Sequence, residues 1–598
     1  MTAGVIDEQH VDAPRTTSLS RTLVTVTAVV TALWLVVLFA WGDAPFVFTY
    51  DDAYYYFAIA RNIASGHGST FDGINLTNGY HPLWMLVSVI PFKLGLDDLV
   101  AARVLLAVQL VFGWGLSLLL IAKLLDRDLA HWPRPSRRDA AADPGRRRAA
   151  TRVLAVLFAL MAVNPFVVKV FVNGLETGIT VTLLAALLLV GSTRRSSWTS
   201  DTTHPWRLGV GLLLAALFLG RTDSALLIGC LFLWCGAEAV RGLRTSERAP
   251  DGTGAAGRGL IALVELFAPA TVTALAYLAF NNATFGTPLQ ISGLVKRAPL
   301  SASTIVTFAI FLVVAALIGH RGFRAAHGRR PKRSPRFVLV GAFASRTAWF
   351  AAFCVLLVGY YTVLQTQIWP WYFAPLVLYV LILFLLAVAD MTDVALADAK
   401  PGATPARALA PLAAIFGVLL VGALVYEAVA FTDPNLRSIQ LADRDAGLWL
   451  RDNTPESTVA ASWDAGATGY FSHRSVINLD GLVNSKAYLE AFQRGDHAAF
   501  VACQGMTHLT NHGGNDDVED RSFRDFIRAA YGDVAARDAV VVYRQPFEFS
   551  GTTLGSGGSG GSGDNGGSGD GAGGAAPRSR EMASWIYAIP PGTVRAGC

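Results

Sequence analysis

Apolar stretches long enough to cross a membrane alternate with short polar segments over roughly the first 430 residues. The first runs from Leu23 to Trp41. Because about 20 apolar residues span a bilayer, it predicts a membrane helix. No small-residue cleavage site follows it, so we interpret it as a retained helix rather than a secretory signal. Further candidates lie at 80–96, 99–122, 150–168, 175–192, 207–220, 223–240, 259–281, 301–319, 347–366, 370–389 and 408–431.

Basic residues between these stretches indicate the orientation. Segments rich in Arg and Lys lie at 123–152, 193–207, 241–258 and 320–346, and the positive-inside rule places them all in the cytoplasm. This requires that one candidate does not span, and 80–96, short and interrupted by Pro91, is predicted to lie flat in the outer interface. The result is a multi-pass plasma-membrane protein of about 11 spans, with its N-terminus inside and its C-terminus outside.

The composition changes after about Phe431. Short apolar runs at 457–461, 476–479 and 539–543 have the length of strands, and 551–576 is almost all Gly, Ser and Asp, which predicts a flexible insertion. Beyond it, Trp585, Ile586 and Tyr587 predict a final strand. We therefore expect a cytoplasmic tail (1–21), a membrane domain (22–432) with a first outer loop (42–98), and a small extracytoplasmic α/β domain (433–598).

The composition agrees with a membrane protein. The chain is 53% hydrophobic and 16% charged, whereas soluble chains carry about 25% charge. These values exclude a disordered chain, a coiled coil and an ordinary cytosolic enzyme. The net charge of +5 is modest, and we predict no nucleic-acid partner. Five cysteines make no disulfide framework; whether Cys503 and Cys598 pair on the oxidising outer side is left open by the sequence.

The first outer loop contains the most informative polar residues. Asp51 and Asp52 are adjacent at the outer end of the first span, where partial desolvation would raise the pKa of one of them. Such a carboxylate can act as a general base toward a hydroxyl or hold a metal ion. The structural alternative is that an Asp caps a helix over 53–65. The neighbouring tyrosines 54–56 fit an interfacial belt, and such rings also stack on sugars.

Other polar residues fall on the same predicted face. Arg221, Lys296 and Arg297 are exceptions on a face that is otherwise poor in basic residues. They are candidates for an anionic ligand such as a lipid phosphate. The alternative is structural, and Arg221 in particular has Asp223 two residues away as a partner for an ion pair. Additional candidates on this face are Glu176, Trp371 and Tyr372.

Several short motifs follow one another along the chain, and their order is informative. The loop opens with Asp51-Asp, continues through Ala60-Arg-Asn, and reaches Asn78-Gly-Tyr-His-Pro-Leu-Trp. The later motifs are Gly174-Leu-Glu-Thr, Gly220-Arg-Thr-Asp, Phe285-Gly-Thr-Pro-Leu-Gln-Ile-Ser-Gly, Trp463-Asp-Ala-Gly-Ala-Thr-Gly-Tyr-Phe and Asn478-Leu-Asp-Gly-Leu-Val-Asn. Together they resemble the GT-C superfamily of membrane glycosyltransferases, which use polyprenyl-phosphate sugars as donors. The resemblance covers most of residues 22–490.

The resemblance implies an inverting displacement in which Asp51 or, with a slight preference, Asp52 deprotonates an acceptor in the cell envelope. Cations would stabilise the departing lipid phosphate. Some relatives use a divalent cation such as Mg or Mn, and no ligand set in this sequence settles the matter. The implied phosphate-binding residues are Arg221, Lys296, Arg297 and His81, and the implied substrate-binding residues are Tyr55, Glu176, Asp223, Trp371, Tyr372, Trp463, Asp464 and Asp480.

Two rival functions share parts of this pattern. A transporter or lipid flippase would have similar spans and intramembrane charges, but the sequence has no internal repeat, and its polar groups gather at one face rather than at the bilayer midplane. A non-catalytic relative that only binds glycan is disfavoured by the Asp51/Asp52 pair without being excluded by it.

Overall fold

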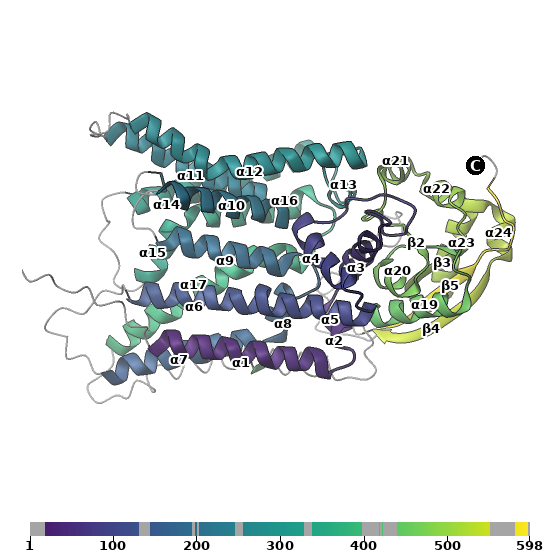
Figure 1. Cartoon of the computed structure of the whole chain (residues 1–598), viewed down its shortest axis with the longest axis horizontal. Helices are drawn as coiled ribbons and strands as arrows, with labels where there is room; N and C mark the ends of the chain where they lie inside the picture. The colour runs from purple at the N-terminus through teal and green to yellow at the C-terminus, as the bar shows by residue number, and fades with distance from the viewer. Residues whose placement is uncertain are drawn as a thin grey trace, which may run out of the picture.

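The computed structural model consists of a long helical bundle with a smaller domain, built on a β-sheet, packed against one end of it (Figure 1). We call this smaller part the sheet domain (439–549, 580–595 and 598). The structure describes residues 18–130, 144–193, 198–199, 203–245, 255–327, 338–397, 418, 421–422, 439–549, 580–595 and 598.

The helical part follows the apolar stretches of the sequence. Its elements are α1 (Ser18–Ala40), α2 (Ala44–Phe48), α3 (Asp51–Ala64), α4 (Pro82–Lys93), α5 (Asp98–Val108), the π-helix η1 (Gln109–Gly115), α6 (Leu116–Ala130), α7 (Pro144–Val163), α8 (Pro165–Phe171), α9 (Thr177–Thr193), α10 (His204–Gly220), α11 (Ser224–Thr245), α12 (Ala255–Phe285), α13 (Ile291–Val295), α14 (Ala302–His327), α15 (Val338–Arg346), α16 (Ala348–Leu364), the 3-10 helix η2 (Pro370–Phe373) and α17 (Ala374–Ala397).

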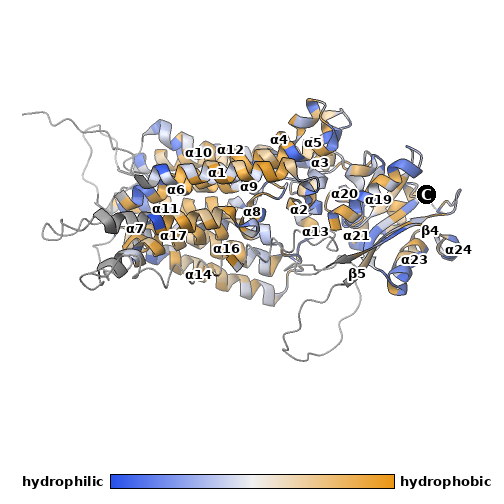
Figure 2. Cartoon of the chain, turned by 90° about the horizontal axis from the view of Figure 1, so that it is seen from below, coloured by the Kyte–Doolittle hydropathy of each residue, from blue (hydrophilic) through white to orange (hydrophobic). Residues whose placement is uncertain are grey.

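Within the described residues, six helices are long and apolar enough to cross a membrane, and the pair α15 and α16, bent by 72°, would make a seventh. Shorter apolar helices cover Pro82–Lys93, Arg152–Val163, Thr177–Ser192 and His204–Gly220. Apolar residues dominate the bundle, as Figure 2 shows. The fold is thus that of a multi-pass helical membrane protein, whereas the number of eleven spans stays a prediction. The expected span at 408–431 lies almost entirely outside the described residues.

The segment expected to lie in the interface forms the short helix α4. It begins with Pro82 at its first turn and has 12 residues, which gives a length of about 18 Å. The hydrocarbon core of a bilayer is about 30 Å thick. A single straight helix of this length does not cross it, and the interfacial position of α4 stays a prediction.

The sheet domain contains a mixed five-stranded sheet in the order β2-β1-β3-β5-β4. Strand β1 (Val459–Ser462) is parallel to β2 (Ser475–Asn478) and to β3 (His508–Gly514), and β5 (Arg580–Ala588) runs antiparallel to both β3 and β4 (Val540–Phe549). The helices are α19 (Ile439–Asn453), α20 (Gly466–Ser472), α21 (Lys486–Arg494), α22 (His497–Cys503), α23 (Asp517–Tyr531) and α24 (Asp533–Asp538). The predicted insertion 551–576 lies outside the described residues.

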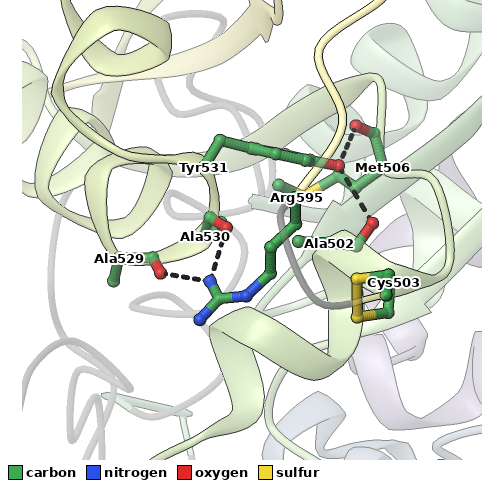
Figure 3. The surroundings of a disulfide bond; sticks show 8 residues. Ala502, Cys503, Met506, Ala529, Ala530, Tyr531 and Arg595 are labelled. Atoms are coloured by element: carbon green, nitrogen blue, oxygen red, sulfur yellow. Dashed lines mark hydrogen bonds between the residues drawn. A yellow bond between two sulfur atoms is a disulfide. The ribbon is translucent and has the colours of Figure 1, made fainter.

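A disulfide fastens the C-terminal end of the chain to this domain. It joins Cys503 at the end of α22 to Cys598, with a Cα–Cα distance of 5.3 Å, so the pairing that the sequence left open is present. Nearby, Arg595 donates hydrogen bonds to the carbonyl oxygens of Ala529 and Ala530 at 2.7 and 2.6 Å (Figure 3). Arg595 and Cys598 are thus held against α23 and α22.

The sheet domain packs directly on the first loop through glycines. A Cβ atom at Gly79 would lie 2.0 Å from the carbonyl oxygen of Leu482, and one at Gly466 would lie 2.2 Å from that of Asp51. No side chain fits at either position, because backbone would have to move. These close approaches bring the start of α3 and the carboxyl ends of β1 and β2 together.

Candidate functional site

A pocket of about 80 Å³ lies where the first loop, the helical bundle and the sheet domain meet. It contains seven of the residues predicted from the sequence, and they come from segments far apart in the chain. Its lining consists of Asp52, Tyr55, Tyr56, Ile59, Gly79, Tyr80, His81, Leu175, Glu176, Ser292, Lys296, Trp371, Tyr372, Leu482 and Val483.

The two adjacent aspartates have different surroundings. The carboxylate of Asp51 accepts hydrogen bonds from the backbone N–H groups of Gly466 and Ala467, both at 2.7 Å, and so holds the start of α20. Burial raises the pKa of Asp51, and the nearby carboxylates of Asp443 and Asp464 raise it further. Asp51 therefore serves the contact between the two parts of the molecule.

Asp52 lines the pocket instead. Its Oδ2 atom lies 3.9 Å from Nζ of Lys296. Burial raises the pKa of Asp52, and the charge of Lys296 opposes that rise. The idea that an Asp caps helix 53–65 is wrong in detail, because α3 begins at Asp51 and its N-cap is Tyr50, without a side-chain cap. Both carboxylates lie in the first turn, where the helix dipole favours negative charge.

Lys296 is the basic partner in the pocket. It follows the short helix α13 and is 7% exposed. Its Nζ donates a hydrogen bond of 2.9 Å to the hydroxyl of Tyr372. Although burial works against its charge, Tyr372 and Asp52 raise the pKa of Lys296 above its ordinary value. An ammonium group held here can attract an anionic ligand.

Arg221 is placed differently from what the phosphate-binding expectation required. It is 3% exposed and does not line the pocket. It donates to Glu176 at 2.9 Å, to Asp223 at 2.8 Å and to the hydroxyl of Tyr361 at 2.7 Å. Two carboxylates thus surround the guanidinium group of Arg221. The ion pair with Asp223, which the sequence offered as the alternative to phosphate binding, is present. Arg221 orients Glu176, whose other oxygen accepts a hydrogen bond of 2.8 Å from Tyr56.

Arg297 also lies apart from the pocket. It is exposed and its backbone forms an isolated bridge with Gln365. Its neighbour Lys296 is turned inward, so adjacent basic residues have opposite surroundings. The sequence could not distinguish them, because a loop has no fixed periodicity that assigns faces.

The carboxyl ends of two parallel strands approach the pocket from the sheet domain. Asp464 follows β1 and Asp480 follows β2, in the position where parallel sheets place ligand-binding residues. The pKa of Asp480 is raised by burial and by the carboxylates of Asp464, Asp51 and Asp52. Neither carboxylate lines the pocket itself, but both belong to the acidic surroundings of Asp52.

Trp463 contributes its backbone rather than its ring. The indole packs on Phe523 and Phe526, with centroid distances of 6.2 and 5.1 Å, inside the sheet domain. Its carbonyl oxygen accepts a hydrogen bond of 3.4 Å from the hydroxyl of Tyr55, and that hydroxyl accepts one of 3.0 Å from Asn478. The ring therefore packs within the sheet domain, and substrate binding by Trp463 stays a prediction.

Sequence reasoning did not single out several residues of the pocket. Two of them, Leu482 and Val483, lie in Asn478-Leu-Asp-Gly-Leu-Val-Asn, a stretch whose motif resemblance could have drawn attention to them. Tyr80 lies within the motif of the first loop. Ser292 likewise lies within the motif that begins at Phe285, although it was not singled out as a site residue.

The expectation of a divalent cation finds no ligand set in the structure. Within the described parts of the chain, no three His, Cys, Asp or Glu side chains are close enough together to hold a metal ion. Use of a divalent cation stays an expectation from the sequence.

The chain was compared with protein-family models, with curated proteins and with solved structures. Residues 434–544 match the family model of a domain of unknown function, DUF8728, and no curated protein matches the chain. The Archaeoglobus fulgidus oligosaccharyltransferase, in complex with Zn and sulfate, is 14% identical with a TM-score of 0.42, over 89% of this chain and 72% of that one.

ArnT from Cupriavidus metallidurans in the apo state is 13% identical with a TM-score of 0.44, over 95% of this chain and 98% of that one. Both solved structures are GT-C glycosyltransferases. Similarity at these TM-scores carries no argument about substrate or mechanism.

Proposed function

We propose that the chain is a membrane glycosyltransferase that transfers a sugar from a polyprenyl-phosphate donor to a cell-envelope acceptor, which is a glycan, a lipid or a protein. The observation that carries this proposal is the pairing of Asp52 with Lys296 in one pocket, 3.9 Å apart, at the end of the apolar bundle. A base and a cation are the two groups that displacement of a lipid phosphate by a hydroxyl requires.

Asp52 takes the proton of the acceptor hydroxyl, whose oxygen then attacks the anomeric carbon of the sugar. The bond from that carbon to the phosphate oxygen breaks, the electron pair goes to the phosphate, and the configuration is inverted. Lys296 stabilises the negative charge that develops on the departing phosphate. Base and leaving group lie on opposite faces of the sugar in this displacement. This displacement therefore requires the groups of Asp52 and Lys296, 3.9 Å apart here, to separate when the donor enters.

The remaining predicted residues have supporting roles in this proposal. Tyr55, Trp371 and Tyr372 line the pocket and offer rings to the sugar. From the sheet domain, Asp464 and Asp480 accept hydrogen bonds from hydroxyl groups of the acceptor. Glu176, held by Arg221, lines the wall next to His81.

The orientation of the chain is part of the proposal. Its basic segments favour a cytoplasmic N-terminus and a sheet domain outside the plasma membrane. A cysteine introduced within 136–148 should resist a membrane-impermeant reagent added to intact cells. Labelling of that cysteine from the outside would overturn the orientation.

Purified protein in detergent, offered a panel of radiolabelled polyprenyl-phosphate sugars, tests the function. Transfer to an added envelope extract supports a glycosyltransferase. Donor binding without transfer from any member of the panel would favour a protein that only binds glycan or lipid. Absence of binding to all donors would favour a transporter instead.

A further inference from the structure

The two ring nitrogens of His81 face different partners. Nδ1 lies 3.0 Å from the side-chain nitrogen Nε2 of Gln290. The ring's own Nε2 lies 3.7 Å from Oε1 of Glu176, and both residues line the pocket. The identity of the atom opposite Nδ1 therefore decides which ring nitrogen bears the proton of a neutral imidazole.

The orientation of the Gln290 amide is fixed by its other contacts. Its nitrogen also contacts the backbone carbonyl oxygen of Tyr80, which can only accept a hydrogen bond. Its oxygen accepts one of 3.0 Å from the hydroxyl of Thr222. Turning the amide over would set two oxygens against each other at Tyr80. The group that meets Nδ1 of His81 is thus an N–H donor, so Nδ1 must offer its lone pair.

The backbone holds His81 at the pocket wall. Its N–H donates a hydrogen bond of 2.8 Å to the hydroxyl of Tyr56, which in turn donates to Glu176. Pro82 then begins α4. Gln290 is 8% exposed and precedes α13, so both members of the pair are fixed at the ends of helices.

The charges around the ring come from three segments. Burial lowers the pKa of His81; Glu176 and Asp223 oppose this, whereas Arg221 and Lys296 add to it. Because Nδ1 offers its lone pair to the Gln290 amide, the ring is neutral, and the lowered pKa agrees with this. A neutral ring whose Nδ1 is occupied has its proton on Nε2, the nitrogen that lies near Glu176 in the pocket wall.

We infer that His81 is a neutral hydrogen-bond donor, through Nε2–H, to a phosphate oxygen bound in the pocket, and that Gln290 is the positioning residue that fixes this tautomer. The choice of phosphate rests on the proposed function. This role differs from that of an additional cation behind Lys296, because the ring contributes a directed donor without a charge.

Nitrogen-15 NMR of histidine-labelled protein tests the tautomer without any substrate. The signal of His81, assigned by its loss in His81→Gln, should show a lone-pair Nδ1 and a protonated Nε2. In Gln290→Glu, which sets a carboxylate against Nδ1, the proton should move to Nδ1 or the ring should become doubly protonated. A protonated Nδ1 in the wild type, or an unchanged spectrum in Gln290→Glu, would overturn the inference.

Binding of sugar-free polyprenyl monophosphate tests the ligand. His81→Gln keeps an N–H donor and should bind within a few-fold of wild type, whereas His81→Leu should bind about 10- to 100-fold more weakly, the range expected for one hydrogen bond to a charged group. Equal binding by His81→Leu, or no binding by the wild type, would overturn the phosphate role. Normal binding with no sugar transfer would instead defeat the proposed function and leave this inference standing.

Discussion

Oδ2 of Asp52 lies 3.9 Å from Nζ of Lys296, although the first is in the first turn of α3 and the second follows α13. Each charge makes the other less costly in a buried place. If Asp52 is the base, Lys296 has two functions, because it keeps the base ionised and attracts the phosphate.

Replacing Lys296 by Met should shift the acid limb of the pH–rate profile to higher pH. Burial raises the pKa of Asp52 and Lys296 lowers it, so loss of the ammonium raises that pKa further. The base is active when deprotonated, and a higher pKa therefore removes activity at a higher pH. Profiles of kcat/KM from about pH 5 to about pH 9 check this.

Lys486→Met is the matched control for this variant. Lys486 lies on α21 in an exposed ion pair with Glu490. Its replacement should leave the acid limb of the pH–rate profile at the same pH. A limb that is unmoved by Lys296→Met, or that moves to lower pH, would mean that the two charges are not coupled.

Arg221→Met should destabilise the protein by about 3–5 kcal/mol, because it leaves two buried carboxylates without their cation. Arg221 contacts both Glu176 and Asp223. Thermal unfolding in detergent measures the loss, and Arg494→Met, at an exposed pair with Asp496, should change little. Should Arg221→Met keep its stability but lose donor binding, Arg221 would be a phosphate ligand after all.

His512 should give the sheet domain a stability that is lost in alkali. Its Nδ1 lies 3.0 Å from Asp443 and its Nε2 3.5 Å from Asp464. Burial alone would lower the pKa of His512, but Asp443 and Asp464 raise it to about 10.

A raised histidine pKa contributes stability that is complete below the unfolded value of about 6.5. The contribution then falls as the pH rises through about 10. His512→Asn should remove this alkaline loss from unfolding curves measured across that window. An identical pH dependence in wild type and variant would count against a charged His512.

The disulfide should be resistant to alkylation and important for the sheet domain. Without reductant, iodoacetamide should leave Cys503 and Cys598 unmodified, and reduction should expose both. Because the bond closes a separation of 95 residues, Cys503→Ser should lower the stability of the domain by about 2–5 kcal/mol. Labelling of both cysteines in the unreduced protein would contradict the pairing.

The sequence allowed much of the architecture to be predicted, because hydropathy acts over long stretches. The apolar runs at 457–461, 476–479 and 539–543 correspond to β1, β2 and the start of β4, and the final strand is β5. Strand β3, His-Leu-Thr-Asn-His-Gly-Gly, was missed because it has few apolar residues and ends in two glycines. Its neighbours β1 and β5 supply the order that its own pattern lacks.

The sequence allowed several residues of the candidate site to be predicted, but not the contacts that each of them makes. Asp52, Lys296 and His81 were named from motif and charge, and they line one pocket. That Asp51 holds α20 and that Arg221 pairs with two carboxylates depends on contacts between distant segments. No local pattern encodes such contacts, so the sequence could not separate the two aspartates or the basic residues.

The most direct measurement compares sugar transfer by wild type, Asp52→Asn and Asp51→Asn from the polyprenyl-phosphate sugar that the wild type accepts. Asp52→Asn should lose about 100- to 10,000-fold in transfer with donor binding retained, the usual contribution of a general base. Asp51→Asn keeps an acceptor oxygen for α20 and should retain most of the activity, with lower stability. Full transfer by Asp52→Asn, or loss confined to Asp51→Asn, would contradict the assignment of Asp52 as the base.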